Sequence, residues 1–234
     1  MAATAPAAAQ TIDLTSIFDP KSGQSAGRII QILLVVTLLS LGPGLLMMVT
    51  CFTRFAIALA FLRAGIGMQT TPSNLILINL ALFMTWLVMA PTFDRAWQSG
   101  MKPLIGNEIS VEEAVPRMAR PFQDFMKSNV RDDDLKRIQA VAAERLNLSP
   151  ALESDDLRIL IPAFMMSELR RGFEIGFLIA LPFLVIDMIV ASVIMSMGMM
   201  MMSPVVFSLP LKVLFFVLID GWGLLVSGLL RSYA

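Results

Sequence analysis

Five ionisable side chains lie within or against apolar segments of this chain, which makes them the residues best placed to do chemistry. They are Glu168, Glu174, Asp187, Lys212 and Asp220. Ionisable groups at membrane depth are costly, so each one is a candidate for ion pairing or for function. We expect a carboxylate to neutralise Lys212, with Glu168 as the favoured partner and Asp187 as the second. The alternative is that the long Lys212 side chain extends to water.

Most kinds of catalytic chemistry lack the residues they need. The chain has no histidine and one cysteine, Cys51, which excludes Ser-His and Cys-His nucleophile pairs and His-ligated metals. A proton relay among the buried acids is possible in principle, but histidine is a common member of such relays. No phosphate-binding glycine loop is present, and the net charge of zero implies no attraction to nucleic acid. The sequence therefore predicts a protein that is not an enzyme and needs no cofactor or metal.

A methionine-rich segment stands in the middle of a charge-free run, between Asp187 and Lys212. Residues 195–204 read MSMGMMMMSP, with four adjacent methionines, Met199, Met200, Met201 and Met202. Gly198 and the Ser203-Pro204 pair disfavour a continuous helix here. Thioether side chains are unbranched and repack easily. The pattern favours a flexible apolar seal in a loop, with a Met-rich hydrophobic helix as the alternative.

Composition places the chain in or at a membrane. Of its 234 residues, 56% are hydrophobic and only 15% are charged, against roughly 25% charged in soluble proteins. Three charge-free runs, 29–53, 64–93 and 188–211, are each long enough to cross a bilayer core, which takes about 20 residues. We expect an all-α, membrane-associated protein of helical hairpins with broken helices.

Four regions follow from the apolar and polar segments. Residues 1–28 are an Ala-rich tail that we expect to be disordered. Residues 29–91 are hydrophobic helices, broken near 42–44 because Pro43 lies between Gly42 and Gly44. Residues 92–158 are a small hydrophilic helical insert, and residues 159–234 are a helical hairpin that carries the Met-rich loop.

Local signals within these regions predict where individual helices begin and end. Thr71 and Pro72 mark a helix start, with the helix ending near Pro91. In the insert, Ser110-Val111-Glu112-Glu113 is a capping box. Pro116 and Pro121 are expected to kink or divide the helix that follows, and a second helix should begin near Asp132.

The basic residues also suggest an orientation. The connection between the first two hydrophobic segments carries Arg54 and Arg63 and no acid. Short basic connections favour the cytoplasmic side of a membrane. The hydrophilic insert would then face the periplasm.

Several motifs, in order along the chain, resemble the FliP family of flagellar biosynthetic proteins. Residues 162–177, PAFMMSELRRGFEIGF, and 181–192, LPFLVIDMIVAS, look like the two family signatures. The segments FTR at 52–54, QTTPSN at 69–74, MGMMMMSP at 197–204 and DGW at 220–222 also fit. The resemblance runs from about residue 30 to residue 230.

The resemblance implies a core subunit of the flagellar type III protein export gate. Such a subunit would form a homo-oligomer and assemble with FliQ and FliR into a closed conduit for unfolded flagellar proteins, with FlhA and FlhB on the cytoplasmic side. It would belong to the flagellar basal body at the bacterial inner membrane. Met199 to Met202 would form the gasket at the narrowest point. The hydrophobic segments would lie largely above the bilayer plane in the assembled complex.

Three alternatives remain open on the residues alone. The injectisome counterpart, SctR, shares the Met-rich loop and the Asp-Gly-Trp motif, although the Met195 to Gly198 segment resembles the flagellar branch more. A small-solute or proton transporter would be expected to show inverted repeats, and none is apparent. A purely structural membrane scaffold would carry no conductance whatever the state of its Met-rich loop.

Overall fold

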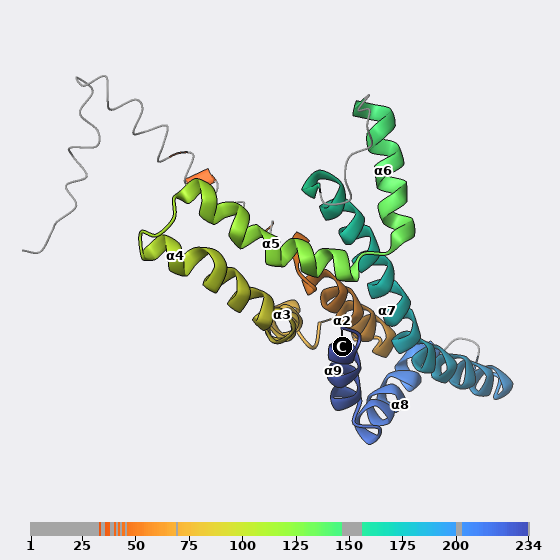
Figure 1. Ribbon diagram of the computed structural model, residues 1–234. Coiled ribbons are helices and arrows are strands. Elements are labelled where there is room, and N and C mark those ends of the chain that lie inside the picture. Colours follow the sequence, from red (N-terminus) through yellow and green to blue (C-terminus); the bar gives the residue numbers. More distant parts are fainter. Residues whose placement is uncertain are drawn as a thin grey trace, which may run out of the picture. The chain divides into compact units, whose positions relative to one another are not determined.

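The computed structural model describes residues 33, 36–37, 40, 42, 44, 46–68, 70–146, 156–199 and 203–233. The described residues contain helices and no strand, as the sequence predicts. The chain divides into two compact units, Met1–Leu46 and Met47–Ala234. The packing below concerns the second unit (Figure 1). The predicted tail, 1–28, lies outside the described residues.

Helices α2, Phe52–Ile66, and α7, Leu157–Ser196, form the centre of the second unit. The buried side of α2 includes Phe55, Leu59 and Leu62. Two glycines of α7 let the helices approach closely, because a Cβ at Gly172 would meet Ile57 and one at Gly176 would meet Phe61. Small residues at a helix crossing bring the backbones together in this way.

Helix α3, Asn74–Ala96, continues through a π-helical turn, Trp97–Met101, into the short α4, Lys102–Ile105. It begins three residues later than Thr71, with Ser73 as its N-cap. It also continues past Pro91, so the predicted boundary at 91/92 falls inside a helix. The sequence changes from apolar to charged near Pro91. Such a change marks where the helix surface stops being apolar, but it does not make the helix end.

The hydrophilic insert contains α5, Val111–Asn129, and α6, Asp132–Leu146. The capping prediction is confirmed, since the backbone N–H of Glu113 donates to Ser110 Oγ at 3.3 Å. The start of α6 at Asp132 is also as predicted. Pro116 and Pro121 were expected to kink or divide this helix, and the division is wrong, because a single helix runs through both.

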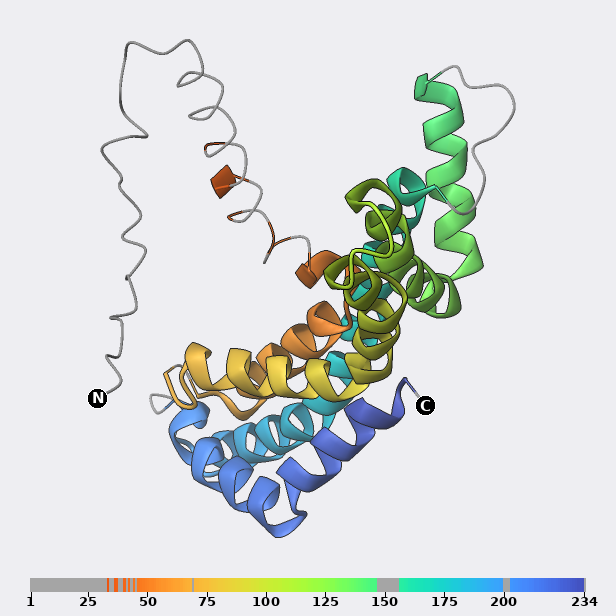
Figure 2. The same ribbon diagram turned by 60° about the vertical axis from the view of Figure 1, so that its left-hand side comes forward.

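The C-terminal arm was predicted as one helix, and the structure has two. Helix α8, Pro204–Leu218, and α9, Gly221–Arg231, meet at 65°, and Figure 2 shows them as a V in blue. Asp220 adopts a left-handed conformation, φ 50° and ψ 53°, which an α-helix of L-residues cannot contain. Gly221 packs directly against the Phe216 ring.

Two helical stretches are long and apolar enough to cross a membrane, Asn74–Ile105 and Leu157–Ser196. The bent pair α8 and α9 would make a third if it counts as one broken span. The fold is therefore that of a membrane-associated helical protein with bent helix pairs, in agreement with the predicted class.

Candidate functional site

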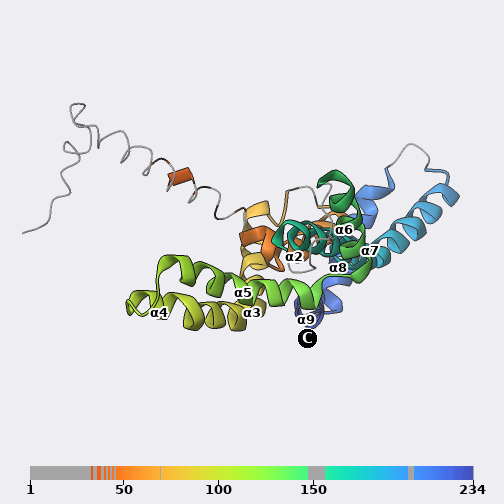
Figure 3. The same cartoon turned by 45° about the horizontal axis from the view of Figure 1, so that its top comes forward.

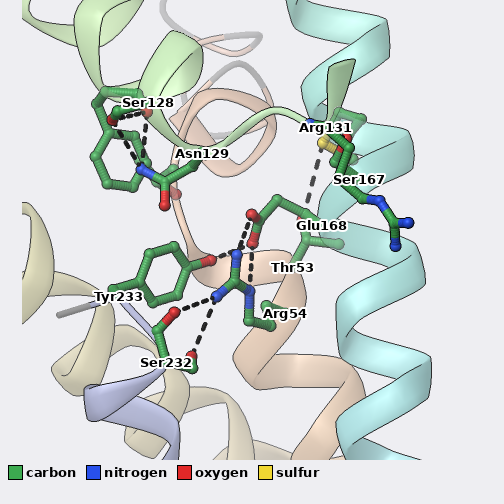
Figure 4. Close-up of polar contacts among 12 residues, drawn as sticks. Thr53, Arg54, Ser128, Asn129, Arg131, Ser167, Glu168, Ser232 and Tyr233 are labelled. Carbon is green, nitrogen blue, oxygen red and sulfur yellow. Dashed lines mark hydrogen bonds and ion pairs between the residues drawn. The ribbon is translucent and has the colours of Figure 1, made fainter. Parts of the chain in front are cut away.

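Two of the most buried charges of the described chain form an ion pair between α2 and α7, drawn in Figure 4. Arg54 donates from Nε to Glu168 Oε2 at 3.0 Å and from Nη2 to Oε1 at 2.5 Å. Their side chains are 1% and 0% exposed. Two parallel hydrogen bonds to one carboxylate are the strong form of this contact. The pair fixes the two central helices at one register.

Residues 232 and 233 complete this cluster. Arg54 Nη1 donates to the Ser232 carbonyl at 3.0 Å and to its hydroxyl at 3.1 Å, and the Arg54 Cζ lies 3.6 Å from the centre of the Tyr233 ring. The Tyr233 hydroxyl donates to Glu168 Oε2. Burial, followed by the charge of Glu168, raises the pKa of Tyr233 well above its ordinary value, so this hydroxyl keeps the proton that it donates. The chain after α9 is thus tied to α2 and α7.

A second polar contact joins the insert to α7, one residue before Glu168. The Ser167 hydroxyl accepts from the Arg131 backbone N–H at 3.0 Å and lies 3.0 Å from both Asp134 Oδ2 and the Ala163 carbonyl. Asp134 is buried, and its Oδ1 has no described partner. Figure 4 shows Arg131 and Ser167 beside Glu168. The start of α6 is therefore anchored next to the central ion pair.

Lys212 pairs with Asp187 and not with Glu168, which corrects the predicted order of its partners. Its Nζ lies 2.5 Å from Asp187 Oδ2 and donates to the Gly65 carbonyl at 3.1 Å. The reason is the geometry of the hairpin: Asp187 lies ten residues before Met197 and Lys212 lies nine residues after Ser203, so the two arms bring them to the same level. Glu168 lies several turns closer to the start of α7 than Asp187 does, and Arg54 neutralises it there.

Of the Met-rich segment, 195–204, the structure describes residues 195–199, 203 and 204, and Met199 is exposed. Helix α7 ends at Ser196, and Gly198 follows with φ 75°. Met200, Met201 and Met202 lie outside the described residues. The gasket assignment stays a prediction.

The predicted helix break stays a prediction as well. Gly42 and Gly44 are helical, and Pro43 lies outside the described residues. In the second unit, helical residues 47–49 are followed by a bend at Thr50 and a turn at Cys51 before α2 begins.

Sequence reasoning missed three members of the central cluster, Arg54, Ser232 and Tyr233. Arg54 was interpreted as a charge that sets orientation and as part of a family motif, and no ion pair was predicted for it. One signal was available: Arg54 is the first charge after Arg28, at the end of an apolar run, and a buried charge needs a partner. Ser232 and Tyr233 carried no such signal. In the described ranges no three His, Cys, Asp or Glu side chains gather into a metal-binding group.

The chain matches known proteins over almost its whole length. The model of the FliP family matches residues 35–229. The flagellar biosynthetic protein FliP of Rhizobium meliloti (strain 1021) is 55% identical over 233 residues, covering 100% of this chain and 95% of the relative. The protein of the same name from Bacillus subtilis (strain 168) is 43% identical over 221 residues, covering 94% and 99%.

Proposed function

This chain belongs to the FliP family, and we propose that it is a core subunit of the flagellar type III protein export gate. In this proposal several copies assemble with FliQ and FliR into a closed conduit for unfolded flagellar proteins. FlhA and FlhB lie on the cytoplasmic side. The relatives at 55% and 43% identity carry the name flagellar biosynthetic protein, which favours the flagellar system over the injectisome.

One observation carries the proposal: both arms that lead to the Met-rich loop present large apolar side chains that nothing in the described chain covers. Met188, Ile189 and Val193 on α7 are exposed, as are Val205 and Val206 on α8. In the described chain one ion pair joins these arms, that of Asp187 with Lys212, and its two charges cancel each other. A patch of large exposed apolar side chains marks a surface that other subunits or lipid cover. A ring of copies would cover them and bring the loops together on an axis.

Methionine suits the closure of such a conduit. A conduit for extended chains of any sequence must close without a specific partner and open without breaking a polar network. Dispersion contacts between thioether side chains are soft and non-directional. Apolar constrictions also exclude ions by dewetting. Met199 to Met202 would supply both properties.

The proposed site of action is the flagellar basal body in the bacterial inner membrane, with the insert, 92–158, facing the periplasm. Support for this orientation now rests on Arg63 alone, because Arg54 is buried in its pair with Glu168. Arg63 lies near the end of α2, is half-buried, and donates to Asn74 Oδ1 at the start of α3.

The direct test is export in a strain that lacks its own family member. A Rhizobium meliloti strain without FliP, supplied with this chain, should again release flagellar subunits into the medium. The tagged chain should also copurify with FliQ and FliR in mild detergent, as a complex whose mass requires several copies. A chain that reaches the membrane in normal amounts but restores no export and copurifies with neither protein would contradict the proposal.

A further inference from the structure

A proline leaves one backbone carbonyl of α7 without its helical partner. Pro182 lies inside the helix and has no N–H, so the carbonyl of Leu178, four residues earlier, receives no α-helical hydrogen bond. The Leu178 side chain is exposed, and no described side chain donates to this carbonyl. A backbone acceptor that becomes covered needs a donor. This carbonyl is therefore a free acceptor on an apolar surface.

A matching donor lies on the other arm of the hairpin. Trp222, near the start of α9, is exposed, and its indole N–H has no hydrogen bond in the part of the chain that the structure describes. The ring packs edge-on against Phe216, with 5.3 Å between the centroids. This contact holds the indole beside the bend between α8 and α9. An indole N–H donates only, and it takes an acceptor when it is buried.

Two contacts within the chain show that this donor and this acceptor lie at the same level along the hairpin. Lys212 lies beside Asp187, and Tyr233 lies beside Glu168. Between these contacts the C-terminal arm advances 21 residues, from 212 to 233, while α7 goes back 19 residues, from 187 to 168. Trp222 comes ten residues after Lys212, which corresponds to nine residues before Asp187. That position is the one with the free carbonyl.

The outer side of α7, which faces away from α8, is apolar and exposed. Helix α7 meets α8 through Phe183 and Asp187. With about 100° between successive helical residues, three exposed residues point to the opposite side: Leu178, Val185 and Ile189. The two arms, α7 and α8, are drawn in cyan and light blue in Figure 3.

The outer side of α8, which faces away from α7, is apolar and exposed as well. The buried residues of α8 form one stripe at a spacing of four: Ser208, Lys212 and Phe216. Three exposed residues lie on the opposite side: Val206, Leu214 and Val217. Leu214 comes two residues after Lys212, so it lies level with Val185, two residues before Asp187.

Charge complementarity makes a second copy of this chain the partner that fits both outer sides. Between residues 175 and 219 the arms carry one ion pair, Lys212 with Asp187, so the outer sides are neutral. The nearest unpaired charges on the two arms have opposite signs, Arg171 on α7 and Asp220 after α8. Copies placed side by side therefore attract each other at this edge.

We propose that Trp222 of one copy donates its indole N–H to the Leu178 carbonyl of the next copy. The inference rests on the proposed function, in which several copies form a ring. Each hairpin lays the outer side of its α8 against the outer side of α7 in the next copy, without a shift along the hairpin. Leu214 of one copy then contacts Val185 of the next. A residue from the second copy thus satisfies the carbonyl that Pro182 leaves free.

Disulfide crosslinking in the complex purified with FliQ and FliR tests this register. A Cys51→Ala background removes the one cysteine of the chain. Val185→Cys with Leu214→Cys should then link neighbouring copies into a ladder of products. The matched control is Val185→Cys with Val206→Cys, which joins the same two sides eight residues apart in level. That offset is about 12 Å, beyond the roughly 7 Å between Cα atoms that a disulfide spans, so the control should stay uncrosslinked.

A second measurement tests the hydrogen bond itself. Trp222→Phe keeps a ring against Phe216 and removes the N–H, so it should weaken association of the copies about fivefold. Pro182→Ala gives the Leu178 carbonyl its helical donor again. In that background Trp222→Phe should therefore weaken association much less. Dilution of the purified complex, followed by the mass of the species that remain, measures both.

The outcomes separate this inference from the proposed function. A complex of several copies in which the 185–214 pair does not crosslink, or in which the control pair does, would overturn the register and leave the export proposal standing. Equal losses for Trp222→Phe with and without Pro182→Ala would overturn the hydrogen bond. A chain that purifies only as a single copy would overturn both proposals.

Discussion

Arg54 and Glu168 show how one buried pair sets the relation of two helices. Each ion lies in an apolar surrounding, where an unpaired charge is costly. The pair is bidentate, the Tyr233 hydroxyl also donates to Glu168, and the remaining Arg54 nitrogen donates to Ser232. Such a cluster stabilises the fold when it is complete and destabilises it when one member is removed.

At this scale we predict that Glu168→Ala lowers the free energy of unfolding by about 3–5 kcal/mol, because it leaves Arg54 buried without a counter-ion. The control is Glu113→Ala, which removes an exposed pair with Arg117 and should cost about 1 kcal/mol or less. Chemical unfolding of the purified chain in detergent measures both. Equal losses for the two variants would contradict the role of the cluster.

Lys212 permits a sharper test, because it contacts both a carboxylate and a carbonyl. Lys212→Arg keeps the charge and the donors and should retain most of the stability. The exchanged pair, Asp187→Lys with Lys212→Asp, should not restore it, since the carboxylate would then face the Gly65 carbonyl. Thermal unfolding midpoints in detergent compare the two. If the chain with the exchanged pair unfolded at the same temperature as the native chain, the Lys212–Gly65 hydrogen bond would contribute nothing to stability.

Among the elements, the α2–α7 crossing depends on two glycines of α7. A Cβ at Gly176 would lie 2.7 Å from Phe61 Cγ, which is closer than real contacts allow. Gly228 in α9 is a matched helical glycine, because a Cβ there meets nothing within 4 Å.

We therefore predict opposite signs for the same kind of change. Gly176→Val should destabilise the chain by about 1–3 kcal/mol through overpacking, whereas Gly228→Ala should stabilise it by up to about 1 kcal/mol through helix propensity. Unfolding in detergent measures both. Stabilisation by Gly176→Val would mean that the two helices are not packed closely at this point.

The elements also show what sequence patterns can and cannot predict. Ser110 and Glu113 specify a helix start through contacts three residues apart, and that start was predicted. The bend at Asp220 depends on a left-handed residue and on Phe216 packing against Gly221, and no pattern of hydrophobicity encodes these. Pro91 was interpreted as a helix end, and Pro116 and Pro121 as points where a helix is kinked or divided, although the helices continue through all three.

For the whole molecule, the sequence predicted the helical class, the membrane association and the family, because these follow from long charge-free runs and ordered motifs. It could not choose between Asp187 and Glu168 as the partner of Lys212. That choice depends on where both arms of the hairpin reverse and on Arg54, which is 114 residues away from Glu168 along the chain. Contacts of such long range become visible only in the folded chain.

The central claim, a methionine seal that closes a conduit, is tested most directly by ion conductance. The complex containing Met199→Ala, Met200→Ala, Met201→Ala and Met202→Ala is reconstituted into lipid bilayers beside the native complex, with Met166→Ala on α7 as the control. We predict an open leak for the fourfold variant, with the native complex and the control closed. A fourfold variant that assembles normally and conducts no more than the native complex would contradict the claim.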